Sequence, residues 1–215
     1  MAETDASFVD LEPEPAAAAA LFGEGIDRAR RFTASLARSG EERGLIGPLE
    51  LPRLWTRHIL NSVIAAPLFR GSVADVGSGA GLPGLVLAIA RPDVSWTLIE
   101  PMERRVAWLD EQVADLELAN VTVVRGRAED VPLSGTFDMA TARAVSALRT
   151  LIPWTAPLVR NGGELALLKG LNAENEISAA QKAIRKFLLT DVRVETLGEG
   201  VLSETTRVLR ATVRG

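Results

Sequence analysis

A glycine-rich loop after a short apolar run is the segment of this sequence whose residue types most clearly indicate chemistry. Residues 73–84 read Val-Ala-Asp-Val-Gly-Ser-Gly-Ala-Gly-Leu-Pro-Gly. Gly77 and Gly79 permit positive φ and let the main chain approach a ligand closely, because no Cβ intervenes. Asp75, inside the expected strand, needs a partner if it is buried: a ligand amino group, a loop amide or a water. The pattern predicts a nucleotide-type binding loop.

The glycine spacing by itself leaves the class of ligand open. Counted from Gly77, the dinucleotide pattern G-x-G-x-x-G fails, because Leu82 stands at its third glycine. Counted from Gly79, the pattern is matched through Gly84. A dinucleotide is therefore not excluded by spacing, and a purely structural loop is a further alternative.

Glu100 stands at the end of the next expected strand, 16 residues after Gly84. In nucleotide-binding α/β sheets, an acid at this place accepts hydrogen bonds from the ribose hydroxyls, which suits a carboxylate and not a basic residue. Glu100 thus predicts an adenosine-type ligand with a free 2'-hydroxyl. The alternative is a residue next to a helix N-cap, since Pro101 and Glu103 follow in a first helical turn.

Two later segments add candidate ligand contacts. Ala128 and Glu129 follow the third expected strand, where such sheets line the adenine with a loop; the alternative is a solvated charge cluster. Arg143 follows the fourth strand, whose carboxyl end faces the cleft. It is expected to pair with the carboxylate of the ligand, to hold an RNA phosphate, or only to balance Asp138 or Glu129.

These residues need a scaffold of alternating strands and helices, and the pattern from residue 72 onward predicts one. We expect strands at 73–76, 96–100, 121–124, 137–142 and 164–169, with helices at about 83–91, 102–117, 146–159 and 174–188. Alternating runs at 191–197 and 205–213 indicate an antiparallel hairpin at the sheet edge. The predicted fold class is α/β: a Rossmann-like, mostly parallel seven-stranded sheet with an antiparallel C-terminal hairpin.

Two helices are expected before the first strand, at 16–36 and about 54–68, separated by glycine- and proline-containing turns. We therefore divide the chain into an acidic tail (1–15), a helical extension (16–70) and an α/β sheet domain (71–215). The tail is acidic and has no apolar period, so it is expected to be mobile unless a partner orders it. Five of the 28 acidic residues lie in its first 14 positions, where no basic residue occurs, so the rest of the chain is nearly neutral and can carry a basic face.

Composition excludes several kinds of site. The 215 residues contain no cysteine, which rules out disulfides, thiolate zinc sites and a cysteine nucleophile, and the single histidine, His58, rules out a histidine-rich metal site. No run approaches the length of a membrane helix, and the N-terminus is acidic where a signal peptide is basic. We expect a cytoplasmic protein with no membrane association and no metal.

With these motifs assembled, the sequence resembles the bacterial RsmG (GidB) family of 16S ribosomal RNA guanine-N7 methyltransferases. The likeness covers most of the chain through five segments: Trp55–Ser62, Asp75–Gly84, Gly126–Glu129, Ala142–Val145 and Leu168–Gly170. The Gly-Leu-Pro-Gly ending of the loop is its most specific part. Asn61 departs from the family, which more often has Asp there, so any role that needs a negative charge at this position is in doubt.

The resemblance implies a class I fold that binds S-adenosyl-L-methionine through Gly77, Leu82, Ala128, Glu129 and Arg143. It also implies a 7-methylguanosine product in the decoding region of the small ribosomal subunit. Guanine N7 has an exposed lone pair and no proton to lose, so we expect in-line attack and no catalytic acid or base.

A basic rim should hold the substrate, 16S ribosomal RNA or the small subunit. The candidates at one end of the sheet are Arg53, Arg57, His58, Arg143 and Lys169; the alternatives are solvated helix charges and, for His58, a structural hydrogen bond. We expect a monomer. Three other functions stay open: a methyltransferase for a small molecule or protein, a nucleotide-sensing module without catalysis, and an NAD-dependent oxidoreductase on a similar sheet.

Overall fold

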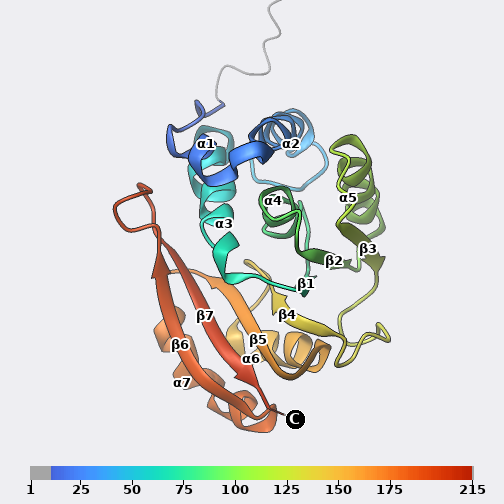
Figure 1. The fold of residues 1–215 in the computed structure, drawn as a ribbon, viewed down its shortest axis with the longest axis vertical. Helices are drawn as coiled ribbons and strands as arrows, with labels where there is room; N and C mark the ends of the chain where they lie inside the picture. The colour runs from blue at the N-terminus through green and yellow to red at the C-terminus, as the bar shows by residue number, and fades with distance from the viewer. Residues whose placement is uncertain (1–10, 215) are drawn as a thin grey trace, which may run out of the picture.

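The computed structural model describes residues 11–214 and is built on a seven-stranded sheet with the strand order β3-β2-β1-β4-β5-β7-β6 (Figure 1). The strands are β1 (Ser72–Val76), β2 (Ser95–Glu100), β3 (Val121–Arg125), β4 (Phe137–Thr141), β5 (Val159–Lys169), β6 (Leu189–Leu197) and β7 (Thr206–Val213). β1 to β5 pair in parallel, and β7 runs antiparallel between β5 and β6. The predicted fold class is confirmed.

The strand order places a ligand cleft between the two halves of the sheet. The chain builds outward from β1 through β2 to β3, then returns to lay β4 on the other side of β1. In open α/β sheets, ligands bind beyond the carboxyl ends of the strands at such a switch point. The loops that carry the predicted site residues follow β1, β2, β3 and β4, so the topology brings them to this one place.

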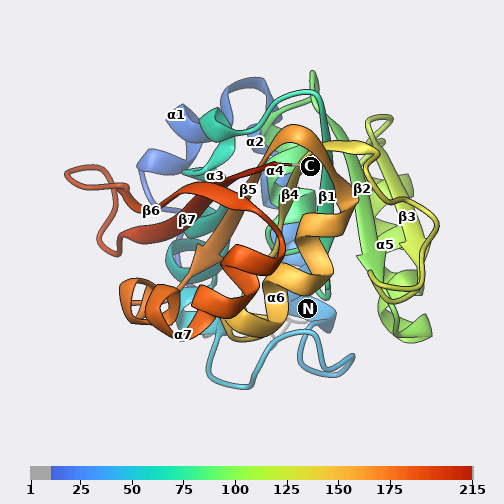
Figure 2. The same ribbon diagram turned by 90° about the horizontal axis from the view of Figure 1, so that it is seen from below.

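Helices cover both faces of the sheet because its strands are apolar on both faces. On one face, Val73 and Leu98 pack in a core shared with the N-terminal helices, α4 and α5; on the other, Ala74 and Val76 pack with α6 and α7. In Figure 1, the N-terminal helices, α4 and α5 lie around β1 and β2, whereas α6 and α7 lie behind β5 to β7. Figure 2 shows the same arrangement from below. The helices are α1 (Ala17–Phe22), α2 (Ile26–Ser39), α3 (Asn61–Val63), α4 (Gly84–Ala90), α5 (Glu103–Asp115), α6 (Leu148–Thr155) and α7 (Ala173–Lys186).

The two expected N-terminal helices are present but are not regular throughout. The first is interrupted by a 3-10 turn, Gly23–Gly25, between α1 and α2. The second begins as a π-helix, η4 (Leu54–Leu60), continues as α3, and ends in a 3-10 turn, Ala66–Leu68. Pro67 lies inside this turn and has no N–H to donate to the Val63 carbonyl, so α-helical hydrogen bonding cannot continue through it. π-Helical turns are rare and frequent at functional sites, and this one carries Arg57 and His58.

The described part of the acidic N-terminal segment packs against the body, contrary to the expectation of a mobile tail for those positions. Leu11 lies against the core, and the Glu12 carboxylate accepts a hydrogen bond of 2.9 Å from the Thr56 main-chain N–H. Glu14 accepts one of 2.7 Å from Arg30 Nε. These contacts join sequence-distant residues, which local composition does not reveal. Residues 1–10 of the expected tail lie outside the described residues.

β5 begins at Val159, five residues before the expected start, because Val159 already pairs with Phe137 of β4. Within residues 11–214, no helix is both long enough and apolar enough to cross a membrane.

Candidate functional site

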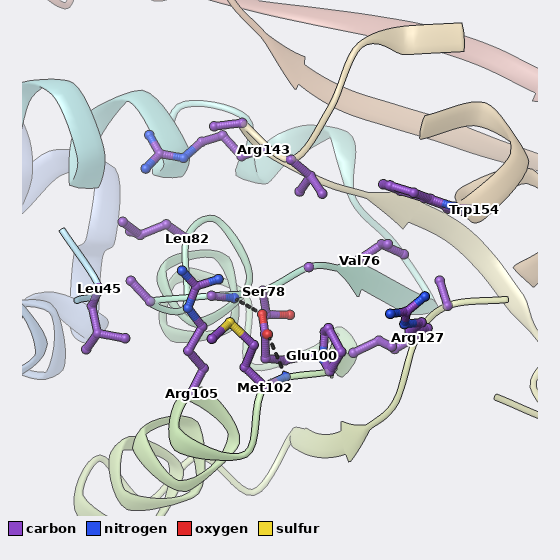
Figure 3. A pocket seen from close by; sticks show the side chains of 18 of the residues that line it. Leu45, Val76, Ser78, Leu82, Glu100, Met102, Arg105, Arg127, Arg143 and Trp154 are labelled. Atoms are coloured by element: carbon purple, nitrogen blue, oxygen red, sulfur yellow. Dashed lines mark hydrogen bonds between the residues drawn. The ribbon is translucent and has the colours of Figure 1, made fainter. Parts of the chain in front are cut away.

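A cavity of about 680 Å³ opens at the carboxyl ends of β1 to β4 (Figure 3). Of the eight predicted cofactor contacts, seven line it: Gly77, Gly79, Leu82, Glu100, Ala128, Glu129 and Arg143. Figure 3 shows that Leu82, Glu100 and Arg143 reach the cavity from three different segments of the chain. The sheet thus brings together residues that are up to 66 positions apart in sequence.

The glycine loop forms one wall, in which the main chain at Gly77 and Gly79 is not covered by side chains of these residues. Gly77 and Gly79 have φ of 71° and 56°, in the left-handed region that L side chains rarely adopt. A Cβ added to Gly77 would lie 2.9 Å from a methyl carbon of Val145, closer than packed atoms allow. The positive φ and the close approach of Val145 both favour glycine at position 77, in agreement with the close main-chain approach predicted from the sequence.

Glu100 is a fixed carboxylate at the floor of the cavity. Its side chain is buried, Oε2 accepts a hydrogen bond of 2.9 Å from Gly79 N–H, and Oε1 accepts one of 3.0 Å from Met102 N–H. An ionised carboxylate has about four lone-pair sites, so each oxygen keeps the capacity to accept one more donor. The residue is therefore pre-oriented for a ligand that presents two hydroxyls.

Asp75, the eighth predicted contact, lies behind the loop and does not line the cavity. It is fully buried; Oδ2 accepts a hydrogen bond of 3.1 Å from Gly84 N–H, and Oδ1 has no partner among the described residues. Burial raises the pKa of Asp75 to about 7. Of the three partners expected for it, the structure contains the loop amide. Asp75 supports the start of α4, and its place argues against direct contact with a ligand in the cavity.

The loop after β3 supplies the opposite wall. Ala128 is nearly buried and Glu129 is exposed, and both line the cavity together with Gly126 and Arg127. Main-chain groups and a carboxylate are thus available on this side of the cavity, and these are the groups expected to meet an adenine ring nitrogen and its exocyclic amine.

Arg143 and His58 are in contact, although 85 residues separate them. Arg143 Nη2 lies 2.7 Å from His58 Nδ1, and Arg143 Nη1 donates to the Arg57 carbonyl oxygen at 3.2 Å. His58 Nε2 lies 2.5 Å from Glu50 Oε2. Burial lowers the pKa of Arg143 to about 10, which leaves it charged at neutral pH. Neither Asp138 nor Glu129, the ion-pair partners weighed from the sequence, is within ion-pair distance; Asp138 pairs instead with Arg160.

A second cavity of about 720 Å³ adjoins the first. His58, Arg143 and Ala144 line both, so these residues form the wall between them. The remaining lining is mostly charged or polar: Arg57, Asn61, Lys169, Glu176, Ser203, Glu204, Thr205, Thr206 and Arg207, together with Leu168, Gly170 and Leu171. Four of the five predicted RNA contacts, Arg57, His58, Arg143 and Lys169, meet at this cavity.

The five predicted RNA contacts differ in what they can offer a polyanion. Arg57 has a side chain that is 47% exposed, and its ion pairs with Glu50 and Glu204 are long, at 3.7 Å and 3.9 Å, so its guanidinium remains accessible to a ligand. Arg53 lines neither cavity and pairs with Glu50 at 2.7 Å. Lys169 is only 8% exposed and pairs with Glu176 at 2.8 Å, so it is not the exposed rim charge that the sequence suggested.

Other residues of the first cavity carried no signal that sequence reasoning used. Leu45, Ile46, Gly47 and Glu50 come from the irregular segment before η4, and Arg105 and Trp154 come from α5 and α6. Among the described residues, no group of three or more His, Cys, Asp or Glu side chains is placed to hold a metal ion.

Comparison with known protein families gives a match over most of the chain. A family model described as rRNA small subunit methyltransferase G matches residues 26–205. A ribosomal RNA small subunit methyltransferase G from Leifsonia xyli subsp. xyli is 68% identical over 95% of this chain and 98% of its own. The protein of the same name from Clavibacter michiganensis subsp. michiganensis is 66% identical, over 94% and 97%.

Solved structures with much lower identity share the fold. The tRNA (m1A58) methyltransferase TrmI from Aquifex aeolicus aligns with a TM-score of 0.52 at 14% identity, over 67% of this chain and 62% of its own. TYW2 of M. jannaschii, solved in complex with AdoMet, aligns with a TM-score of 0.52 at 18% identity, over 67% and 69%. At these identities, the likeness concerns the architecture of the sheet and its helices.

Proposed function

This chain belongs to the rRNA small subunit methyltransferase G family, and on that premise we propose that it methylates 16S ribosomal RNA at N7 of a guanine in the decoding region, with S-adenosyl-L-methionine as methyl donor. The observation that supports this most directly is the pair of adjoining cavities. The first combines the main chain of the glycine loop, many apolar side chains and several charged ones around the fixed carboxylate of Glu100, whereas the second is lined mostly by charged and polar side chains. The two cavities share the wall formed by His58, Arg143 and Ala144.

The residues of the first cavity fit the cofactor. Its volume lies within the range of about 300–1,000 Å³ typical of small-molecule sites. When bound, S-adenosyl-L-methionine supplies an electrophilic methyl group on a sulfonium. Glu100 is placed to accept the ribose hydroxyls while it remains bonded to the loop, and the bare main chain at Gly77 leaves room for the adjoining part of the ligand.

The chain needs only to align its two substrates. Guanine N7 attacks with its own lone pair, so no side chain has to remove a proton from it. The residues around the shared wall would orient the base and exclude water, which converts the encounter into a near-unimolecular step. We therefore name no catalytic acid or base, and the reaction requires no resident metal.

Several finer points are part of the same proposal. Arg57 is the RNA contact with the strongest support, since it is exposed at the second cavity. We propose a cytoplasmic monomer, with a helical extension up to residue 70 and a methyltransferase domain from residue 71. Membership of a methyltransferase family decides against the NAD-dependent oxidoreductase and the non-catalytic nucleotide sensor.

Mapping of methylated nucleosides in ribosomal RNA tests the proposal. RNA from cells that lack this gene should miss one 7-methylguanosine in 16S RNA, and the gene should restore it. Incubation of the purified protein with labelled cofactor and small subunits from the deletion strain should transfer label to the RNA. Label in protein or in a small molecule instead would support the alternative methyltransferase substrates.

A further inference from the structure

Three side chains form a continuous hydrogen-bonded row along the wall between the two cavities. Glu50 Oε2 and His58 Nε2 are 2.5 Å apart, and His58 Nδ1 and Arg143 Nη2 are 2.7 Å apart. His58 and Glu50 are largely buried, with side chains 15% and 19% exposed. The row joins the segment before η4, η4 itself and the segment after β4.

The hydrogen-bonding chemistry of Arg143 and Glu50 determines which nitrogen of the His58 ring carries the hydrogen. A guanidinium has five N–H donors and no acceptor, so His58 Nδ1 must accept the bond from Arg143 and cannot carry a hydrogen. The ring is then the neutral tautomer with its hydrogen on Nε2, which donates to the Glu50 carboxylate. A charged imidazolium would place a donor against the donors of Arg143.

The surrounding charges agree with this assignment. Burial, followed by the charge of Arg143, lowers the pKa of His58 below its ordinary value. Burial tends to raise the pKa of Glu50, but hydrogen bonds from His58 and Arg53 outweigh it, and the pKa lies below its ordinary value. The charged groups that face His58 or act on its neighbours, from every segment packed there, are Glu50, Arg53, Arg57, Arg143, Asp75 and Glu204.

Because His58 is neutral, it holds the Arg143 guanidinium without offsetting its charge, whereas a carboxylate would offset it. Arg143 is held by two uncharged acceptors, His58 Nδ1 and the Arg57 carbonyl oxygen, both from η4. Within residues 11–214, no carboxylate oxygen lies within ion-pair distance of its guanidinium. The arginine is thus fixed in place without being neutralised, and its charge stays available to an anionic ligand in either cavity.

We propose that His58 is a positioning residue: as a neutral acceptor anchored by Glu50, it orients the Arg143 guanidinium toward the carboxylate of the bound cofactor without cancelling its charge. The ligand side of this inference rests on the proposed function; the tautomer and the contact with Arg143 do not. His58 then has a different role from the RNA contact expected from the sequence.

Nitrogen NMR of the imidazole tests the tautomer directly. His58 is the only histidine of the chain, so its ring signals are unambiguous in the full-length protein. At pH 7.5 we expect an unprotonated Nδ1 and a protonated Nε2. Arg143→Gln should raise the pKa of His58, because it removes the neighbouring positive charge. An imidazolium or the Nδ1–H tautomer in the wild type at pH 7.5 would overturn the proposal, whatever the activity of the enzyme.

Two matched variants test whether the acceptor that holds Arg143 must be uncharged. The side-chain oxygen of His58→Asn can stand in for Nδ1 as a neutral acceptor, whereas His58→Asp has the same shape but carries a charge. With S-adenosyl-L-homocysteine as the probe in calorimetry at pH 7.5, we expect His58→Asn to bind within about threefold of wild type and His58→Asp about tenfold more weakly than His58→Asn, as expected for the loss of a charged hydrogen bond. Equal affinities of the two variants would contradict the proposal.

The pH profile separates positioning from a merely structural role. When the pH is lowered through the midpoint that NMR reports for the ring, His58 in the wild type gains a proton on Nδ1, so affinity for S-adenosyl-L-homocysteine should fall with that same midpoint. His58→Asn should lack that midpoint. If His58→Asp proves unfolded by circular dichroism, the comparison of wild type with His58→Asn decides: a shared midpoint refutes the proposal. Failure of the wild type to methylate small subunits would instead count against the proposed function.

Discussion

The two cavities on either side of Arg143 are built from different materials. About half of the residues that line the first are apolar, and the main chain at Gly77 and Gly79 and several charged side chains complete it. Among the charged side chains, Glu100 is held by hydrogen bonds from two main-chain N–H groups. The second is lined by charged and hydroxyl side chains from η4, from the end of β5 and from the segment before β7. Its most exposed basic residue, Arg57, has no close ion-pair partner.

The contrast follows from the ligands that each cavity would accept. A cofactor of fixed shape is recognised best by groups that cannot move, and main chain fixed by a sheet costs no side-chain entropy on binding. A polyanion is attracted by charge over a longer range, and flexible basic side chains serve that purpose without exact geometry. Changes in the first cavity should therefore affect cofactor affinity strongly, and changes in the second should affect RNA affinity modestly.

The largest effect should come from Glu100→Gln. The amide nitrogen cannot accept a hydrogen bond, so one of the N–H groups of Gly79 and Met102 would face another donor in a buried site. Affinity for S-adenosyl-L-homocysteine should fall by roughly 100-fold in calorimetry, since a buried unsatisfied donor and a lost acceptor together cost a few kcal/mol. The control is Glu103→Gln, whose side chain is 77% exposed; similar losses in both variants would contradict the role of Glu100.

A somewhat smaller loss should follow Gly77→Ala. The new Cβ would sit 2.9 Å from a Val145 methyl carbon, at a φ of 71°. We expect roughly tenfold weaker binding of S-adenosyl-L-homocysteine, because backbone strain of this kind costs about 1–3 kcal/mol and the cavity wall must shift. Gly162→Ala is the matched control: Gly162 has φ of 77° with nothing within 4 Å of its Cβ position. Both should lose stability, and only Gly77→Ala should lose ligand affinity.

Arg57→Glu changes the second cavity and leaves the first intact. Small-subunit or RNA binding should weaken by about fivefold at physiological salt, and the slope of log K against log salt should flatten by about 0.7 for one lost phosphate contact to a single strand. Affinity for S-adenosyl-L-homocysteine should be unchanged. Arg193→Glu, on edge strand β6 with a 48% exposed side chain, is the matched charge reversal. Equal loss of cofactor and RNA binding at Arg57 would break the proposed division between the cavities.

The smallest effect on ligand binding is expected for Asp75→Asn, which acts beneath the first cavity. The folded-state pKa of Asp75, about 7, lies above its ordinary value, so the native state holds a proton that the unfolded chain releases from about pH 4 upward. Stability contributed by the protonated form is therefore lost as pH rises from about 4 through 7. In urea unfolding at pH 5 and pH 8, the wild type should lose more stability than Asp75→Asn over this interval. Equal losses would show that Asp75 is ionised in the native state.

Short-range patterns predicted most of the scaffold. The apolar runs gave all seven strands, within a few residues for all but the start of β5, and the glycines at 77 and 79 have the positive φ for which they were chosen. Seven predicted cofactor contacts line one cavity, because parallel strands bring the residues that follow them to one edge of the sheet. The actual ligand contacts of these residues remain predictions.

Long-range packing accounts for what was missed. No local pattern indicates that Glu50 lies beside His58 and Arg143, since the latter two are 85 residues apart and belong to segments of irregular geometry. The sequence predicted that Lys169 is an exposed charge at the rim. Its ion pair with Glu176 depends on how α7 packs and cannot be inferred from neighbouring residues. The segment around Glu12 was predicted to be part of a mobile tail, yet the Glu12 carboxylate accepts a hydrogen bond from η4.

The order of strands and helices, the glycine loop and the acid at the end of β2 can be predicted from local sequence, because strand period, turn chemistry and the freedom of glycine are properties of neighbouring residues. Which side chains share the wall between the cavities, and which charges pair, depends on tertiary packing. Burial and pairing depend on the distance between segments far apart in the chain, and that distance exists only once the sheet has formed.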